Sequence, residues 1–281
     1  MCAPRAHGFG PSAVFRLYRG DNRIQDYSTK NRGVSGLGSS FGEPQGNNGQ
    51  ASAINNRGQI TGFAETTVSD SSCPASSPSK TDSPVIWEDG KARALPTVGS
   101  DPDGEANAIN DQGQAVGYSG TCTAANHAVV WENGTPIPLQ DLGVEGLSLA
   151  WAINDQGQIV GEVTNPEGTT QTAALWQNRA ITDLGTLPGD FGSLASGINS
   201  KGQVVGSTWD SNFNWSHAFI YQDGVLTDLN TLFPKETNLH LRATMANKIN
   251  ERGQISGMAT VLSGPDTGKV HAFLATPVNE P

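Results

Sequence analysis

A nine-residue cassette returns five times along this chain, and its spacing constrains the fold more strongly than any other feature. The first copy reads INNRGQITG at 54–62, and the Asn residues of successive copies lie 44 to 55 positions apart. The five copies begin at Ile54, Ile109, Ile153, Ile198 and Ile249. This period is typical of a four-stranded propeller blade rather than of a helical or leucine-rich repeat. Each cassette is therefore expected to belong to one blade.

Each cassette has the pattern of a tight β-hairpin. In the third copy, apolar pairs at 152–153 and 159–160 flank the polar run NDQGQ at 154–158. The Gly of this run stands where a short hairpin loop needs left-handed backbone, and the Asn can bond its own main chain. We interpret the recurring Asn residues as turn formers rather than as ligands.

A second apolar signature follows each cassette and predicts a third strand. In the second repeat it reads HAVVWENG at 127–134. A fourth strand is expected in repeats one to four, at 92–95, 137–143, 181–185 and 226–229. Four strands is the number in a propeller blade. The sequence thus predicts an all-β fold, a five-bladed β-propeller of four-stranded antiparallel blades.

The fifth repeat lacks a fourth strand, because the sequence stops soon after its third-strand signature at 271–275. The run VSGLGS at 34–39 resembles ITDLGT at 181–186, and we expect it to supply the missing strand. An N-terminal strand that completes the last blade would close the ring and hide both sheet edges. This predicts a propeller at 34–281 and an N-terminal appendage at 1–33, which carries no cassette.

These motifs resemble those of the HAF-repeat family. His-Ala-Phe stands at 217–219 and 271–273, the hairpin INSKGQVVG at 198–206, and the tail DLGTL at 183–187. The resemblance covers residues 34–276, although repeats one and three depart from His-Ala-Phe. It implies a bacterial repeat protein that is extracellular and has no assigned activity.

Charge and hydropathy exclude two classes of partner. The chain carries 27 acidic and 17 basic residues, a net charge of −10 that repels phosphate backbones and anionic membranes. We therefore expect no nucleic-acid partner. No run approaches the 18 apolar residues of a membrane span, so none is predicted.

The predicted location is extracellular or at the cell surface. The low charge content and the family resemblance favour a secreted chain from which a leader has been removed. Cys73 and Cys122 both fall between strands two and three, in adjacent blades. This shared location suggests a disulfide, which would fit an oxidising compartment, and two free thiols are the alternative.

All five linkers between blades carry acid, and a propeller would place these linkers on one face. The acidic residues are Glu43, Asp101, Asp103, Glu105, Glu145, Asp190 and Glu236. A ring of carboxylates can bind a cation or sugar hydroxyls, or supply an acid and a base to a glycosidic bond. The group Asp101, Asp103 and Glu105 resembles a short calcium loop, so calcium is the one cofactor considered. The alternative is a set of solvated turns in an acidic protein.

Three tryptophans add to this candidate face. Trp151 stands where the other repeats carry Ser or Asn, and we expect it near the central channel, either stacked on a sugar or plugging the channel. Trp209 and Trp215, with Phe213, put three aromatics into one polar loop, which is either a contact patch or buried beneath the loop. The candidate ligand-binding residues are Trp151, Trp209, Trp215, Asp190, Glu145 and Glu236.

Other recurring residues are interpreted as structural. His127, His217 and His271 share one repeat position, so they are spread around the ring and cannot converge on a metal unless they face the axis. Aromatic residues at 87, 131, 176 and 221 also share one position, and we expect them to fill the space between blades.

The leading functional hypothesis is a non-catalytic propeller that binds a glycan or a cell-surface protein on the acidic face. A hydrolase or lyase acting on carbohydrate with carboxylates around the channel mouth is the second hypothesis. A structural repeat of a surface or matrix is the third. The sequence contains no nucleophile elbow, phosphate loop or zinc spacing, although carboxylates drawn from different blades would leave no local motif.

Overall fold

Five antiparallel sheets make up the described part of the chain. A computed structural model describes residues 48–74, 79–122, 127–144, 146–233 and 241–277. The chain divides into two compact units, Met1–Gly36 and Leu37–Pro281, and all described residues belong to the second. The strand predicted at 34–39 and the appendage at 1–33 lie outside the described residues.

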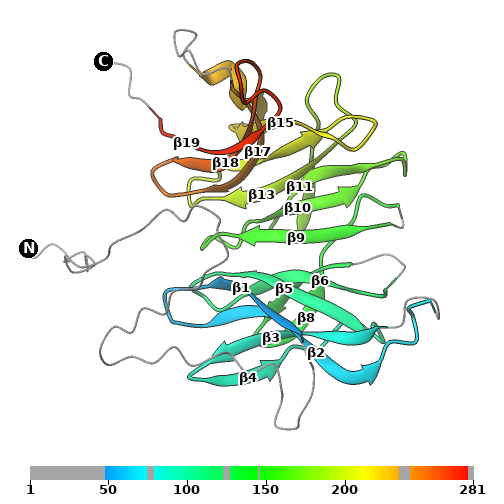
Figure 1. Cartoon of the computed structure of the whole chain (residues 1–281). Coiled ribbons are helices and arrows are strands. Elements are labelled where there is room, and N and C mark those ends of the chain that lie inside the picture. The colour runs from blue at the N-terminus through cyan, green and yellow to red at the C-terminus, as the bar shows by residue number, and fades with distance from the viewer. Residues whose placement is uncertain (1–47, 75–78, 123–126, 145, 234–240, 278–281) are drawn as a thin grey trace, which may run out of the picture. The chain divides into compact units, whose positions relative to one another are not determined.

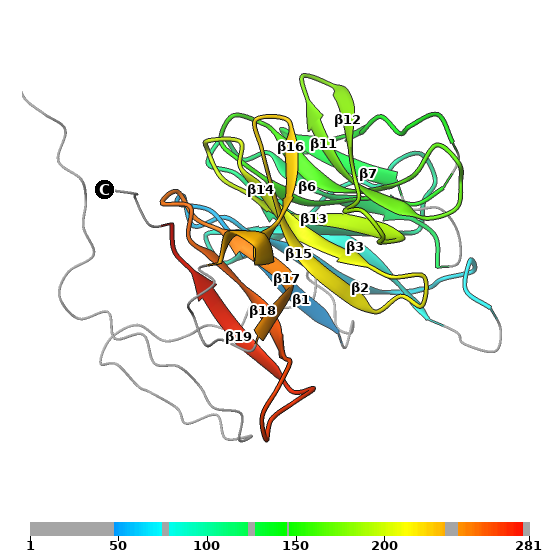
Figure 2. The same cartoon turned by 90° about the horizontal axis from the view of Figure 1, so that it is seen from above.

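Each sheet, called a blade below, takes its strands in chain order (Figures 1 and 2). Blade one consists of β1 (Gly49–Ile54), β2 (Ile60–Ser69), β3 (Lys80–Glu88) and β4 (Lys91–Ala94). Blade two consists of β5 (Asp103–Ile109), β6 (Ala115–Gly120), β7 (His127–Glu132) and β8 (Thr135–Pro138). Blade three consists of β9 (Ser148–Ile153), β10 (Ile159–Thr164), β11 (Gln171–Gln177) and β12 (Ala180–Gly185).

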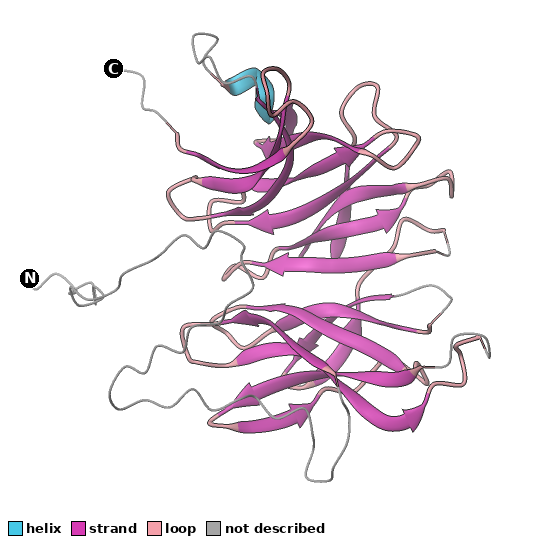
Figure 3. Cartoon of the chain, viewed as in Figure 1, coloured by secondary structure: helices cyan, strands magenta, loops and turns pink. Residues whose placement is uncertain are grey.

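The last two blades follow the same plan, and blade five has three strands among the described residues. Blade four consists of β13 (Gly192–Ile198), β14 (Val204–Trp209), β15 (Trp215–Gln222) and β16 (Val225–Asp228). Blade five consists of β17 (Leu241–Ile249), β18 (Ile255–Val261) and β19 (Val270–Ala275). A short 3-10 helix, η1 (Leu229–Leu232), joins the two blades (Figure 3). The predicted four-stranded antiparallel blades are thus confirmed for repeats one to four, and blade five has three strands within the described residues.

The cassette forms the hairpin between the first and second strands of every blade. In blade three, Asn154 Oδ1 accepts hydrogen bonds from the backbone N of Gln156 and Gln158, at 3.1 and 3.0 Å. Gly157 takes the left-handed conformation at φ 74°, which a residue without Cβ adopts at little cost. The structure therefore confirms the turn-forming role of the cassette Asn.

The same Asn side chains also join the blades, which the sequence did not reveal. Asn55 Nδ2 donates to the backbone O of Asn110 in the next blade at 3.0 Å, and the donation is repeated down the array. The further rungs are Asn110 to Asn154, Asn154 to Asn199 and Asn199 to Asn250, at 3.2, 3.0 and 3.1 Å. The four donor Asn residues are buried. This Asn ladder gives the array a direction, because each blade donates to the one that follows it.

Apolar side chains fill the spaces between consecutive blades. Trp131 packs among residues of blades one and two, and Trp176 among residues of blades two and three. Each indole is 1% exposed and donates Nε1–H to the carbonyl of a linker residue, Pro96 or Gln140. Tyr221 packs in the same way between blades three and four. The predicted inter-blade position of the aromatic residues is confirmed for these three.

The two end blades leave matching faces uncovered in the described structure. Ile54 is 67% exposed, whereas Ile109, at the same position in blade two, packs against blade one. Leu274 of blade five is also 67% exposed, whereas Val130, at the same position in blade two, is buried against blade three. Within the described residues, blades five and one do not close a ring, so closure stays a prediction. No helix of the described residues is long and apolar enough to cross a membrane.

Candidate functional site

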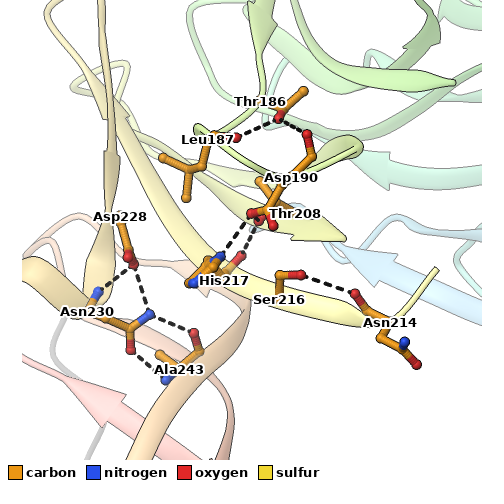
Figure 4. A network of polar contacts seen from close by, with 10 residues as sticks. All are labelled: Thr186, Leu187, Asp190, Thr208, Asn214, Ser216, His217, Asp228, Asn230 and Ala243. Carbon is orange, nitrogen blue, oxygen red and sulfur yellow. Dashed lines mark hydrogen bonds and ion pairs between the residues drawn. The ribbon is translucent and has the colours of Figure 1, made fainter. Parts of the chain in front are cut away.

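The strands place two distinct sets of turns at opposite ends of the blades. The cassette rim carries the cassette turns and the turns between third and fourth strands. The loop rim carries the loops between second and third strands and the linkers between blades. Asp190 of the linker at 186–191 and the turn at 210–214 meet at the loop rim of blade four (Figure 4).

A polar network centres on the carboxylate of Asp190, which is 6% exposed (Figure 4). Thr208 Oγ1 donates to Asp190 Oδ2 at 2.5 Å, and His217 Nδ1 lies 2.9 Å from the same oxygen. The His217 side chain is 31% exposed, so part of its imidazole reaches the surface. The network therefore ties the linker to β14 and β15 and presents an imidazole beside it.

This network differs from a nucleophilic triad. In such a triad the hydroxyl donates to the imidazole, which removes its proton during attack. Here the hydroxyl of Thr208 donates to the Asp190 carboxylate and to the backbone O of His217, and not to the His217 imidazole. The arrangement thus fixes His217 beside Asp190 and does not activate the Thr208 oxygen.

Four aromatic rings lie in the same part of blade four. Trp209 and Trp215 form an edge-to-face pair with centroids 5.5 Å apart, and Phe191 and Phe213 form another at 6.0 Å. Phe213 is 70% exposed and Trp215 is 39% exposed. Both alternatives drawn from the sequence therefore apply, because Trp209 is buried while Phe213 and Trp215 face solvent.

Trp209 carries an unused donor in this aromatic group. Its indole is 6% exposed, and Nε1–H has no acceptor among the described residues. The hydroxyl of Thr170 is also buried without a partner there. A Cβ built on Gly192 would lie 2.4 Å from the Trp209 ring and 2.6 Å from Thr170 Oγ1, so only Gly fits between them. Buried polar groups normally have partners, so Trp209 and Thr170 are exceptions, as are the hydroxyls of Thr61 and Thr172.

Phe213 occupies a backbone conformation that the cassette turns assign to Gly. Asp210 Oδ1 accepts from the backbone N of Asn212 and Asn214, at 2.8 and 3.0 Å, as the Asn does in a cassette turn. Phe213 N donates to Asp210 O at 2.9 Å, as the cassette Gly donates to its Asn. Phe213 therefore stands at the Gly position of this turn, at φ 61°. A bulky residue with positive φ is rare, because its side chain crowds the backbone.

Trp151 lies in blade three and contacts a buried acid. Its indole Nε1–H donates to Glu162 Oε1 at 3.2 Å. Burial raises the pKa of Glu162 to about 7, although the hydrogen bond from Trp151 acts in the opposite direction. The sequence singled out Trp151 but not Glu162. The residue that directly follows the nine-residue cassette is Glu162 in the third repeat, and in the others it is Phe63, Tyr118, Ser207 or Met258.

The three acids of the calcium prediction point to separate partners. Asp101 accepts from Ser119 Oγ at 2.7 Å, Asp103 from the backbone N of Asp82 at 2.8 Å, and Glu105 from Ser52 Oγ at 2.9 Å. Burial, with the nearby charges of Asp70 and Asp82, raises the pKa of Asp103 to about 6. Among the described residues, these three acids do not form a group close enough to share a metal ion. Asp103 and Glu105 lie two residues apart on β5, where extended backbone separates them by about 7 Å, and Asp101 lies in the linker before this strand.

The remaining predicted residues fall in three places. Cys73 and Cys122 form a disulfide across blades one and two, with an S–S distance of 2.12 Å, beside Asp70. His127 and His271 are exposed, and neither bonds a linker acid as His217 does in the described structure. Glu43, Glu145 and Glu236 lie outside the residues whose side chains are described.

The structure thus brings together Asp190, Trp209 and Trp215 and leaves Trp151 in another blade. Thr208, Phe191 and Thr170 were not found by sequence reasoning. One signal in the sequence was available for Thr208, because the same repeat position holds another hydroxyl residue, Ser119, in blade two. In the structure, Ser119 donates to Asp101 as Thr208 donates to Asp190.

The fold and this site define an all-β repeat protein of the β-propeller class. Among solved structures, the chain is similar to the beta-propeller domain of the Trilobed protease from Pyrococcus furiosus, with a TM-score of 0.42 and 16% identity. The match covers 65% of this chain and 51% of that chain, so it spans about half the length of that structure. No family model and no curated protein matches the chain.

Proposed function

We propose that this protein is a secreted, non-catalytic binding module that holds a neutral glycan on the loop rim of blade four. The observation that carries the proposal is Phe213, an aromatic residue displayed to solvent from a backbone conformation that favours Gly. Such strain costs about 1 to 3 kcal/mol and persists where surrounding contacts enforce it, which is characteristic of functional sites.

The chemistry around Phe213 suits a sugar. The exposed faces of Phe213 and Trp215 offer apolar surface for the C–H side of a pyranose ring, as aromatic rings do in binding sites. His217, held by Asp190 and 31% exposed in its side chain, offers a polar partner for hydroxyl groups. The net charge of −10 favours an uncharged glycan over an anionic one.

Two further parts of this proposal concern location and closure. The disulfide between Cys73 and Cys122 supports an extracellular or cell-surface location, because disulfides persist in oxidising compartments. Membership of the HAF-repeat family, proposed from the sequence motifs, agrees with this location. We also propose that the five blades form a closed ring, with residues 34–39 as the fourth strand of blade five. The uncovered Ile54 and Leu274 support this closure, since each occupies a position that is packed between other blades.

The test uses the variant Phe213→Gly, which removes the ring and relaxes the turn. We expect glycan affinity to fall at least tenfold while stability stays equal or rises by up to about 1 kcal/mol, because Gly adopts positive φ freely. Binding would be measured by calorimetry against a panel of neutral polysaccharides. Gly58→Phe, which builds a matched ring into a cassette turn on the other rim, is the control. Unchanged affinity in Phe213→Gly would overturn the proposal, as would failure of the wild-type chain to bind any neutral glycan.

One observation favours the second candidate function, a carbohydrate hydrolase or lyase. Glu162 is a buried carboxyl group with a pKa of about 7, and a group with such a pKa can donate a proton near neutral pH. This second function predicts that the wild-type chain releases new reducing ends from a bound polysaccharide and that Glu162→Gln does not. That result would show an enzyme in place of a binding module. A chain that neither binds nor cleaves would leave the structural repeat as the remaining function.

A further inference from the structure

A cavity of about 570 Å³ opens between blades two and three at the cassette rim, away from blade four. Its apolar wall includes Val130, Ile137, Ile159 and Trp176. Trp176 and Ile159 are buried parts of the core between these blades, so the wall is fixed in place by packing. The volume lies within the range of small-molecule sites, which is roughly 300 to 1,000 Å³.

The neighbouring groove shows why this one is open. Between blades one and two, the guanidinium of Arg93 lies over Gly134, with Nη1 2.6 Å from the position of a built Cβ. The guanidinium of Arg57 lies over Gly113 in the same way, at 2.4 Å. Blade two carries Ile137 where blade one carries Arg93, and Gln112 where it carries Arg57. No arginine from blade two therefore covers the corresponding groove.

One arginine does stand at this cavity, and its backbone is unusual. The turn between the third and fourth strands is Asp89-Gly90 in blade one, and Asn133-Gly134 and Asp223-Gly224 in blades two and four. Blade three has Asn178-Arg179, and Arg179 lines the cavity at φ 66°. This two-residue turn needs positive φ at both positions, which is why Gly is preferred at the second. Arg179 thus adopts, with a side chain, the positive-φ conformation that its three counterparts adopt as Gly.

The charges at the cavity are open to a ligand. Arg179 is exposed and makes no hydrogen bond or ion pair with any described residue. Glu132, which also lines the cavity, accepts from Gln114 Nε2 at 2.9 Å through Oε1, which leaves Oε2. The cavity therefore combines a guanidinium, a carboxylate and an apolar wall.

We propose that this cavity binds a free α-amino acid with an apolar side chain. Arg179 would hold the carboxylate through paired N–H donors, because the planar guanidinium matches a carboxylate. Glu132 would accept from the ammonium group, and the wall beside Trp176 would cover the side chain. A zwitterion carries no net charge, so the acidic chain does not repel it. This inference does not depend on the glycan site of blade four.

The test is calorimetry of the whole chain with L-leucine and L-phenylalanine as probes. We expect one of them to bind, and the analogues without the amine (4-methylpentanoate, 3-phenylpropanoate) or without the carboxylate (3-methylbutylamine, 2-phenylethylamine) to bind at least tenfold more weakly. Arg179→Gly should lower affinity at least tenfold while its melting temperature stays equal or rises, since Gly suits the turn. Lys91→Gln, which removes one positive charge beside the equivalent turn of blade one, is the control and should bind as the wild type does.

Two results would overturn the proposal. One is the absence of binding by both amino acids at 10 mM, about the weakest affinity that a specific site of this size would show. The other is equal affinity for leucine and 4-methylpentanoate, or for wild type and Arg179→Gly. Because neither probe is a sugar, loss of this site would leave glycan binding by Phe213 unaffected, and the two proposals fail separately.

Discussion

At the scale of single residues, two side chains stand where equivalent turns have Gly, and both lie at candidate sites. Phe213 and Arg179 each keep positive φ in a turn whose hydrogen-bonding pattern is repeated elsewhere in the chain. The repeats act as internal controls, because the other copies show what the turn itself requires. The aromatic residue belongs to the loop rim and the arginine to the cassette rim.

Glu162 allows a prediction of pH dependence at this scale. Its pKa is raised from 4.5 to about 7 by burial, so the folded state binds a proton more tightly than the unfolded state. The stability from this group is therefore fully present below about pH 4.5 and is lost as pH rises through about 7. At pH 8, Glu162→Gln should be more stable than wild type by about 1 to 3 kcal/mol, and the difference should vanish near pH 4.

Urea unfolding at several pH values, followed by tryptophan fluorescence, measures this difference. Since Trp151 donates to Glu162, the folded wild type should also show a fluorescence titration near pH 7 that is absent from Glu162→Gln. A constant stability difference from pH 4 to pH 8 would contradict the assignment.

At the scale of the structural element, the cassette hairpin combines a turn with a joint between blades. Asn154 accepts two backbone hydrogen bonds in its own turn and donates to Asn199 in the next blade. Asn250 makes the same turn, but it is exposed and has no following blade among the described residues. Substitutions at Asn154 and Asn250 therefore separate the stability contributed by the turn from the stability contributed by the hydrogen bond between blades.

We predict that Asn154→Ala lowers the free energy of unfolding by about 2 to 4 kcal/mol, because it removes both turn bonds and also the buried rung to Asn199 O, which keeps only Gly202 N as a donor. Asn250→Ala should cost about 1 kcal/mol, which is typical of losing a turn side chain near solvent. Equal losses in the two variants, measured by urea denaturation, would show that the joint adds no stability. Gln158→Ala is a useful control, since it alters the same turn without removing the rung.

The disulfide between Cys73 and Cys122 gives a second prediction for elements. It joins loops of blades one and two across 49 residues of chain. Restricting a loop of this length in the unfolded state stabilises the fold by at most about 4 kcal/mol. The double variant Cys73→Ser/Cys122→Ser should unfold at lower denaturant, by about 2 to 4 kcal/mol, and should bind glycan at blade four as the wild type does. A loss below 0.5 kcal/mol would indicate that the bridge contributes little to stability.

At the scale of the whole molecule, ring closure is the principal open prediction. The variant Ile54→Cys/Leu274→Cys places thiols on the two uncovered faces. In a closed ring, mild oxidation should give a monomer with a new intramolecular disulfide, detected by mass spectrometry and by faster migration on a non-reducing gel. Head-to-tail disulfide-linked oligomers would instead place the two faces on different molecules, and absence of both products would contradict closure. Ile54→Cys/Phe213→Cys is a matched control with one thiol on the opposite rim.

The sequence predicted the architecture well because a repeat reports the same local rule five times. Hairpins, blade order and the inter-blade tryptophans all followed from period and pattern. The site was predicted only in part: Asp190, Trp209 and Trp215 were identified, but their contacts depend on backbone register, which spacing does not specify. The calcium group shows the opposite error, because Asp101, Asp103 and Glu105 are close in sequence yet their carboxylates bond separate partners.

The Asn ladder bears on what determines the number of blades in such a chain. Every rung is the same hydrogen bond from one cassette Asn to the next, so further blades could extend the ladder at either end and the ladder itself does not limit their number. The number of blades in a closed ring must then depend on the angle between adjacent blades. That angle depends on the bulk of the side chains between them, such as Trp131, Trp176 and Tyr221. In a molecule of this kind, a smaller side chain between two blades changes the angle between them, and with it the number of repeats that a ring can hold.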